Sequence, residues 1–281
     1  MTELIRVTRG VWRPPEALPD LTARCAALLS VLPTDAVVAG RTAAQLHGLW
    51  LPTPDEPDRV EVIVQGTSEL PRNHARSGRH EVRVRRRRLR CDEITQVGEV
   101  PVTALPLTWL HLAECLCLED LVAAGDSVLR SGAREDELSD VVQRAVRQRG
   151  VRRARSALPL LDARSRSRPE SWMRVGFVQR GLRPSGVNLP VRDEWGQWLA
   201  EPDLSYEDAR LAVEYNGRFH ADLDRMRRDI TREVDVAERG RWLTVTLGPV
   251  QVFQRMDQAA ALVRELRRER LMIMTLASSR R

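Results

Sequence analysis

Acidic side chains in the second half of the chain have the types and spacing that metal-dependent cleavage of a phosphodiester needs. Glu170 opens a predicted helix, Asp203 follows Pro202 on a predicted strand (197–206), and Glu214 lies on the next predicted strand (209–215). A tight turn near residues 207–208 would join the two strands as a hairpin and place Asp203 beside Glu214. Converging carboxylates bind Mg²⁺ or Mn²⁺, which orients and activates water. We therefore expect Glu170, Asp203 and Glu214 to be metal ligands.

Each acid also has an ordinary structural explanation. Glu170 fits a first-turn acid that complements the helix dipole, and an Asp after proline commonly begins a strand or turn. Asp229 and Arg232, three residues apart on a predicted helix, are typical of an exposed ion pair that stabilises little. A metal-dependent catalytic site is favoured only when these residues are considered together, in their order along the chain.

That order resembles the PD-(D/E)XK nuclease superfamily over roughly residues 165–260, and within it the branch related to very-short-patch-repair (Vsr) endonucleases. The matching motifs are Arg168-Pro169-Glu170, Gly181-Leu182-Arg183-Pro184, Pro202-Asp203-Leu204, Glu214-Tyr215-Asn216-Gly217, His220, Asp229, Arg232 and Gly240-Arg241-Trp242. The resemblance implies a Mg²⁺-dependent DNA endonuclease, which could be a nickase, acting on damaged, mismatched or foreign DNA.

The sequence departs from the superfamily where a Lys normally follows the second acid by two residues. Asn216 stands there, and none of the 45 basic residues is Lys. Asn216 can hydrogen-bond a water molecule, and His220 can act as a general acid or base near neutral pH. Arg232 or Arg218 can bring fixed positive charge to the phosphate. The resemblance therefore implies catalytic roles for Asp203, Glu214, Asn216, His220 and Arg232.

Other residues are candidates for contacts with nucleic acid. The densest charge run, RVRRRRLR at 83–90, would place alternate Arg side chains on one face of a strand. That face suits phosphates, or else it is the solvated face of an edge strand. The candidate nucleic-acid contacts are Arg83, Arg85, Arg87, Gln179 and Arg218.

Two Trp residues, Trp195 and Trp198, flank a predicted hairpin turn in the second half. Exposed Trp side chains can stack on bases or wedge between them. Packing on the sheet is the commoner outcome for such a residue. We expect one of this pair to pack there.

The first half resembles the central region of AbiEi-type antitoxins and transcriptional regulators. The segments that carry this resemblance are RVTRGVWRP (6–14), AGRTAAQLHGLWLP (39–52) and VGEVPVTALPLTWLHLA (97–113). It implies an alternative function, in which the protein is a non-catalytic DNA-binding regulator and the nuclease-like half serves only as a platform.

The elements that must position these residues follow from periodicity along the chain. Strand-like and helical segments are mixed up to residue 104, helical spacing dominates 105–164, and residues 165–281 read as helix, strands, helix, strand, helix. This order predicts an α/β protein. It has an N-terminal mixed α+β region, a helical connector, and a restriction-endonuclease-like α/β sandwich with a mixed sheet.

Composition limits the classes of function and partner. The net charge is +6 with a pI near 10.0, and an all-Arg basic surface suits phosphate backbones, although drift in genome composition also produces Arg excess. No apolar run approaches the roughly 18 residues of a membrane span, and the four Cys residues lack zinc-ligand spacing. We expect a cytoplasmic protein whose partner is single- or double-stranded DNA. RNA stays an alternative, because carboxylates do not read the sugar, and no membrane or protein partner is indicated.

Overall fold

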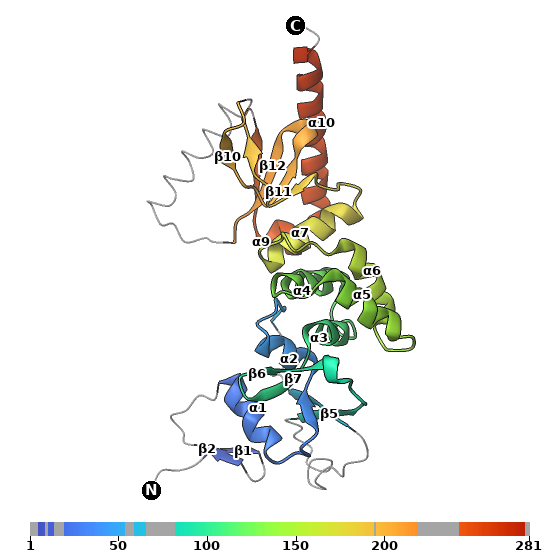
Figure 1. Ribbon diagram of the computed structural model, residues 1–281. Coiled ribbons are helices and arrows are strands. Elements are labelled where there is room, and N and C mark those ends of the chain that lie inside the picture. Colours follow the sequence, from blue (N-terminus) through green and yellow to red (C-terminus); the bar gives the residue numbers. More distant parts are fainter. Residues whose placement is uncertain are drawn as a thin grey trace. The chain divides into compact units, whose positions relative to one another are not determined.

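The computed structural model describes residues 5–8, 11–13, 20–53, 59–65, 82–193, 195–217 and 242–278. The chain forms two compact units, Met1–Pro159 and Leu160–Arg281 (Figure 1). Both contain helices and a mixed sheet, so the predicted α/β class is confirmed. The helices predicted as a connector belong, as far as Pro159, to the first unit.

The first unit is built on a mixed sheet of five strands in the order β5-β4-β3-β7-β6. Its strands are β3 (Ala36–Val38), β4 (Val60–Val64), β5 (Val82–Arg86), β6 (Ile94–Val97) and β7 (Val100–Thr103). A separate antiparallel pair joins β1 (Ile5–Thr8) to β2 (Val11–Arg13). The strands are rich in Val and Ile because a buried sheet face selects β-branched side chains.

Helices cover this sheet and continue beyond it within the first unit. They are α1 (Leu21–Leu29), α2 (Gly40–Leu46), α3 (Leu105–Leu112), α4 (Leu118–Arg130), α5 (Glu135–Arg144) and α6 (Val151–Ala157), with short 3₁₀ turns at Cys91–Glu93 and Leu158–Leu160. Cys25 and Leu28 of α1 pack on the buried strand residues. Trp109 of α3 is fully buried and its indole N–H donates to the Leu121 carbonyl at 2.8 Å, which fixes α3 against α4.

The second unit has a four-stranded sheet in the order β13-β12-β11-β8, in which only β12 and β13 are parallel. Its elements are α7 (Arg168–Gln179), β8 (Gly186–Val187), β9 (Val191–Arg192), β10 (Trp198–Ala200), β11 (Leu204–Tyr206), a 3₁₀ turn at Glu207–Ala209, β12 (Leu211–Tyr215), β13 (Leu243–Leu247), α9 (Pro249–Phe253) and α10 (Met256–Ser278).

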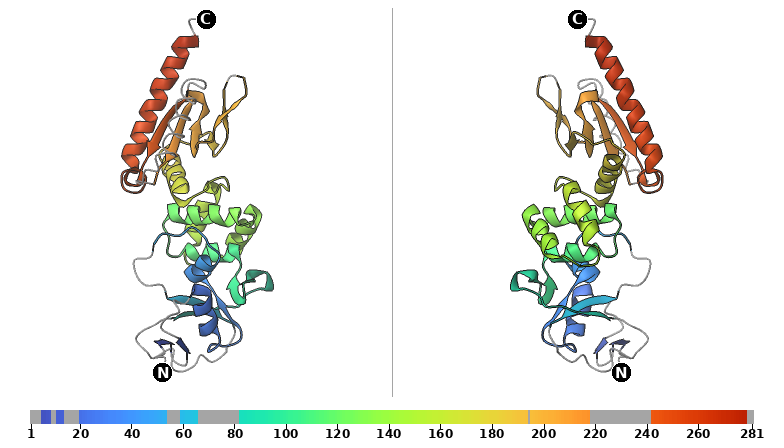
Figure 2. Two further views of the ribbon diagram at one scale, coloured as in Figure 1. Left: turned by 90° about the vertical axis from the view of Figure 1, so that its left-hand side faces the viewer. Right: turned by 90° about the vertical axis from the view of Figure 1, so that its right-hand side faces the viewer.

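The two faces of this sheet pack against different elements. Leu204 and Val213 point toward α7 and α10 and belong to the main core. Side chains alternate along a strand, so Ala212 points to the other face, where it meets Val191 and Trp242. The β9–β10 hairpin therefore lies on the face opposite α10 (Figure 2).

Within the described residues, no helix combines the length and the apolar character that crossing a bilayer requires.

Candidate functional site

The hairpin predicted between Asp203 and Glu214 is confirmed. Strands β11 and β12 pair antiparallel, and Leu204 lies opposite Val213. Asp203 is the residue just before β11, and extending this register by one step would place it opposite Glu214. Glu214 follows the alternation of Ala212 along β12, so it belongs to the sheet face that carries the β9–β10 hairpin. The backbone N–H of Tyr215 donates to Asp203 Oδ2 at 2.7 Å and fixes the Asp203 carboxylate against β12.

Burial makes the charged form of Asp203 costly. Burial is the largest cause and the nearby charges of Glu170 and Glu214 add to it, so that the pKa of the Asp203 carboxyl rises from 3.8 to about 7. The Tyr215 N–H and the Arg166 guanidinium act in the opposite direction, but they do not offset burial. Glu170 and Glu214 are therefore each close enough to act on the Asp203 carboxyl, and a bound cation would relieve that repulsion.

Glu170 is held by hydrogen bonds at the start of α7, where only 8% of the residue is exposed. Its Oε2 accepts from the backbone N–H of Arg166 at 2.7 Å and from Asn188 Nδ2 at 2.8 Å, and its Oε1 accepts from the Ser167 hydroxyl at 2.8 Å. The Ser167 hydroxyl in turn caps α7 by accepting the Glu170 N–H at 3.4 Å. Glu170 thus joins the helix start to the preceding loop and to the end of β8.

Asn188 connects this network to Asp203. Its backbone N–H donates to the Asp203 carbonyl at 3.1 Å, and its side-chain amide also donates to the Arg164 carbonyl at 3.0 Å. Asn188 takes a left-handed conformation with φ 45°, which Asn tolerates better than most residues. The sequence motifs did not single out Asn188 or Ser167, although Ser167-x-x-Glu170 is the capping-box spacing that marks a helix start.

The acids do not form a complete three-ligand cage as they stand. Among the residues that the structure describes, no group of three His, Cys, Asp or Glu side chains is arranged to hold a metal ion. Glu170 already accepts three hydrogen bonds, whereas the Asp203 carboxylate is held against β12 near Glu214. The latter two carboxylates fit a divalent cation by their chemistry, because Mg²⁺ commonly binds one or two protein carboxylates and keeps several waters.

A cation that the motifs did not indicate lies beside the acids. Arg166 pairs with Glu201 at 2.9 Å, and its side chain is 48% exposed. Its charge lowers the pKa of the Asp203 carboxyl, so Arg166 is near enough to act on the site.

The remaining predicted residues of this site fall in different places. Asn216 follows β12 on the same side as Glu214 by alternation, and its backbone N–H donates to the Leu247 carbonyl at 2.9 Å. Arg218, His220 and Arg232 lie outside the described residues. Gln179 is exposed at the opposite end of α7 from Glu170, about 13 Å along the helix, so the structure does not bring it to the acids.

Two of the three Arg residues predicted to contact nucleic acid from the Arg-rich strand, Arg85 and Arg87, pair with acids of the first unit. β5 is an edge strand of its sheet. Arg85 pairs with Glu114 at 2.7 Å and lies 3.8 Å from Glu61, so its charge is paired within the unit. Arg87 donates to the Gln148 side chain at 3.0 Å and lies 3.9 Å from Glu93. Only Arg83 of the three is exposed, so this strand offers less free charge to phosphates than its sequence indicates.

The expectation that one of two Trp residues packs on the sheet is wrong. Trp195 is 72% exposed and Trp198 is 56% exposed. The Asp193 carboxylate orders the turn between them by accepting the N–H groups of Trp195 at 2.9 Å and Gln197 at 2.8 Å. The buried residues of this hairpin pack on Ala212, on the sheet face of Glu214, while both Trp side chains stay exposed.

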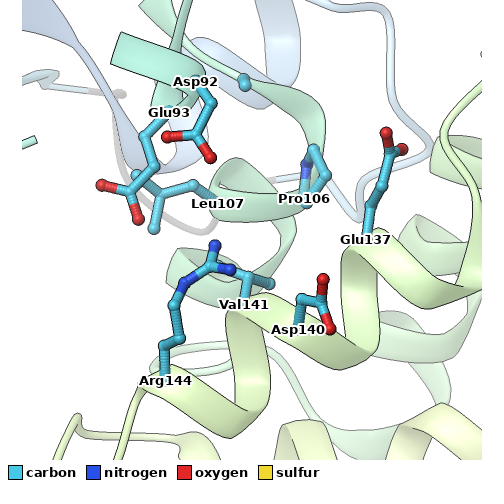
Figure 3. A pocket seen from close by; sticks show the side chains of 9 residues that line it. Asp92, Glu93, Pro106, Leu107, Glu137, Asp140, Val141 and Arg144 are labelled. Atoms are coloured by element: carbon cyan, nitrogen blue, oxygen red, sulfur yellow. The ribbon is translucent and has the colours of Figure 1, made fainter. Parts of the chain in front are cut away.

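The first unit contains a cavity of about 220 Å³ between α5 and the start of α3 (Figure 3). Its lining includes Asp92, Glu93, Glu137 and Asp140 with one cation, Arg144. Carboxylates outnumber the guanidinium, so this cavity does not suit a phosphate group.

Comparisons with known proteins give relatives without a stated activity. No family model matches the chain. Two proteins of Mycobacterium tuberculosis, "Uncharacterized protein MT2308" and "Uncharacterized protein Rv2248", are each 30% identical over 275 residues, which covers 95% of this chain and 94% of theirs. A crystal structure of the RV2827C protein from Mycobacterium tuberculosis has a TM-score of 0.40 and 17% identity, over 56% of this chain and 60% of that one.

Proposed function

The chain belongs to the family of the mycobacterial protein Rv2248, and we propose that it is a metal-dependent endonuclease that hydrolyses phosphodiester bonds in DNA. One observation carries the proposal: the half-buried Asp203 carboxylate is held against β12 beside Glu214, and its pKa is raised to about 7 by desolvation and by the charges of Glu170 and Glu214. A carboxylate with a costly charge is typical of a functional site. The motif order that resembles Vsr-like nucleases supports damaged, mismatched or foreign DNA as the substrate.

The proposed roles divide between the described residues and those assigned by resemblance. Asp203 and Glu214 hold Mg²⁺ or Mn²⁺, which when bound activates water and neutralises phosphate charge. Glu170 positions the site by fixing the start of α7 and the end of β8, and it remains a candidate outer ligand. Asn216 orients water. By resemblance, His220 serves as acid or base and Arg232 contacts the phosphate.

Cleavage assays test this proposal directly. Purified protein is incubated with supercoiled, nicked, mismatched and single-stranded DNA, and with an RNA strand, in Mg²⁺, Mn²⁺ or EDTA. We expect cleavage of DNA with either metal and none in EDTA, and a strong loss in Glu214→Gln. Failure to cleave every substrate, or full activity in Glu214→Gln, would remove the proposal.

Metal binding should also depend on pH in a defined direction. The proton on Asp203 competes with the cation below about pH 7, where burial keeps the carboxyl neutral. Saturating Mg²⁺ should therefore raise the melting temperature by about 5–10 °C at pH 8 and by little at pH 5. Differential scanning fluorimetry measures this, with NaCl of equal ionic strength as the control. An equal rise at both pH values would show that the cation binds elsewhere.

A second candidate function is a DNA-binding regulator without catalysis. The observation that favours it is that Glu170 is occupied by hydrogen bonds, while no three-ligand group is assembled among the residues described. This function requires DNA binding in EDTA that Glu214→Gln leaves unchanged. Titration calorimetry with Mg²⁺ separates the two candidates. Only the nuclease is expected to release or absorb heat on binding Mg²⁺, and this heat should be absent in Glu214→Gln.

A further inference from the structure

A run of Arg side chains surrounds the turn between α5 and α6 in the first unit. Residues 141–161 contain six Arg and no Asp or Glu. Two of the six have local roles, because Arg144 lines the acidic cavity and Arg153 Nη1 donates to the Ala113 carbonyl at 2.9 Å. The other four are exposed, and we name them the α5–α6 Arg surface: Arg147, Arg149, Arg152 and Arg155.

The fold holds this surface in place. Val151, Ala154 and Ala157 are 7%, 0% and 0% exposed, so helical periodicity directs Arg152 and Arg155 to solvent. The turn before α6 is docked on the end of α3. Gly150 has φ 83°, and a Cβ there would lie 2.4 Å from the Ala113 carbonyl oxygen, so only glycine permits this approach.

The charge of the α5–α6 Arg surface is not neutralised within the described residues. Ion pairs elsewhere in those residues occupy Arg85, Arg87, Arg90, Arg134, Arg164, Arg166, Arg180 and Arg267. The four members of the surface form no such pair with any residue that the structure describes. Four like charges on one turn and one short helix repel each other, and a polyanion relieves that repulsion.

The chemistry of the surface favours a phosphodiester backbone. Guanidinium groups fork onto phosphate oxygens with two donors, and four of them spaced along a turn and a helix match a row of phosphates better than one small anion. Val146 is the one large apolar side chain exposed within the described residues 141–161. That leaves little apolar surface to enter a lipid bilayer.

We propose that the α5–α6 Arg surface binds the phosphate backbone of double-stranded DNA, through the first unit and without metal. The contact needs neither Asp203 nor Glu214. The protein therefore binds DNA through its first unit whether or not the second unit cleaves it.

Fluorescence anisotropy with a short duplex in EDTA tests this on the 281-residue chain. The variant R147Q/R149Q/R152Q/R155Q should bind at least ~10-fold more weakly at low salt, and the slope of log K against log salt should become shallower by about 3. A matched variant, R59Q/R183Q/R255Q/R268Q, removes the same charge from exposed Arg residues elsewhere and should change affinity less than ~3-fold.

Equal losses in the two variants would overturn the proposal, because net charge alone would then explain binding. Tighter binding to phosphatidylserine vesicles than to DNA, lost in the same variant, would also overturn it in favour of a membrane surface. Circular dichroism checks folding. If the fourfold variant does not fold, R147Q/R149Q in the turn should still lose affinity, with R59Q/R268Q as its control.

Discussion

Replacing Asp203 with Asn is expected to remove metal-dependent cleavage and, at pH 8, to make the metal-free protein more stable than the wild type. Loss of the anionic ligand should lower the cleavage rate by on the order of 10²–10³-fold. Stability should rise because Asn can still accept the Tyr215 N–H, which now donates to Asp203 Oδ2 at 2.7 Å, while it carries no charge to be desolvated.

The pH dependence follows from the raised pKa of Asp203. The folded protein holds this proton up to about pH 7, whereas the unfolded chain releases it near 3.8. The resulting stabilisation is complete at pH values below the pKa of the unfolded chain, and it is lost as the pH rises to the folded-state pKa of about 7. The difference corresponds to on the order of 4 kcal/mol, which solvent contact reduces to about 2–3 kcal/mol.

Urea denaturation in EDTA at pH 5 and pH 8 measures this effect. The free energy of unfolding should fall between the two pH values more in the wild type than in Asp203→Asn. Asp257→Asn is a control at a side chain that is 90% exposed, where a change below ~0.5 kcal/mol is expected. If Asp203→Asn is less stable than the wild type at pH 8, the ionised Asp203 carboxylate does not destabilise the folded protein.

Replacing Glu170 with Ala should destabilise the second unit by about 3–5 kcal/mol. The substitution leaves the Arg166 N–H, the Ser167 hydroxyl and the Asn188 amide without their acceptor beside a buried helix start. A buried donor without a partner costs the full desolvation of that group. The urea midpoint of the second unit should fall accordingly.

Glu170→Gln is the matched control for this loss. Its amide oxygen can still accept from Arg166 and Asn188, and its NH₂ group can donate to the Ser167 hydroxyl, so most of the stability should remain. Removing the charge should also lower the pKa of Asp203 and move the pH dependence of stability to lower pH. Equal destabilisation by Ala and Gln would show that charge, not hydrogen bonding, is the main contribution of Glu170.

Local patterns in the sequence were enough to predict the hairpin that opposes Asp203 to Glu214. Alternating apolar residues on both sides of a short polar turn specify an antiparallel pair, and period-two alternation then fixes which side chains share a face. The same reasoning identified an α/β protein, since helix and strand periodicities differ within short windows.

Long-range contacts decided the rest. The partners of Glu170 include Asn188, which is 18 residues away, and no local pattern reports such a hydrogen bond. The sequence of the Arg run at 83–90 did not indicate that Arg85 pairs with Glu114, which lies 29 residues away. It also did not indicate that both Trp195 and Trp198 are exposed to solvent. A sequence fixes which groups are present and how neighbours alternate. Whether a charge is buried, paired or exposed depends on residues that only the tertiary fold brings near it.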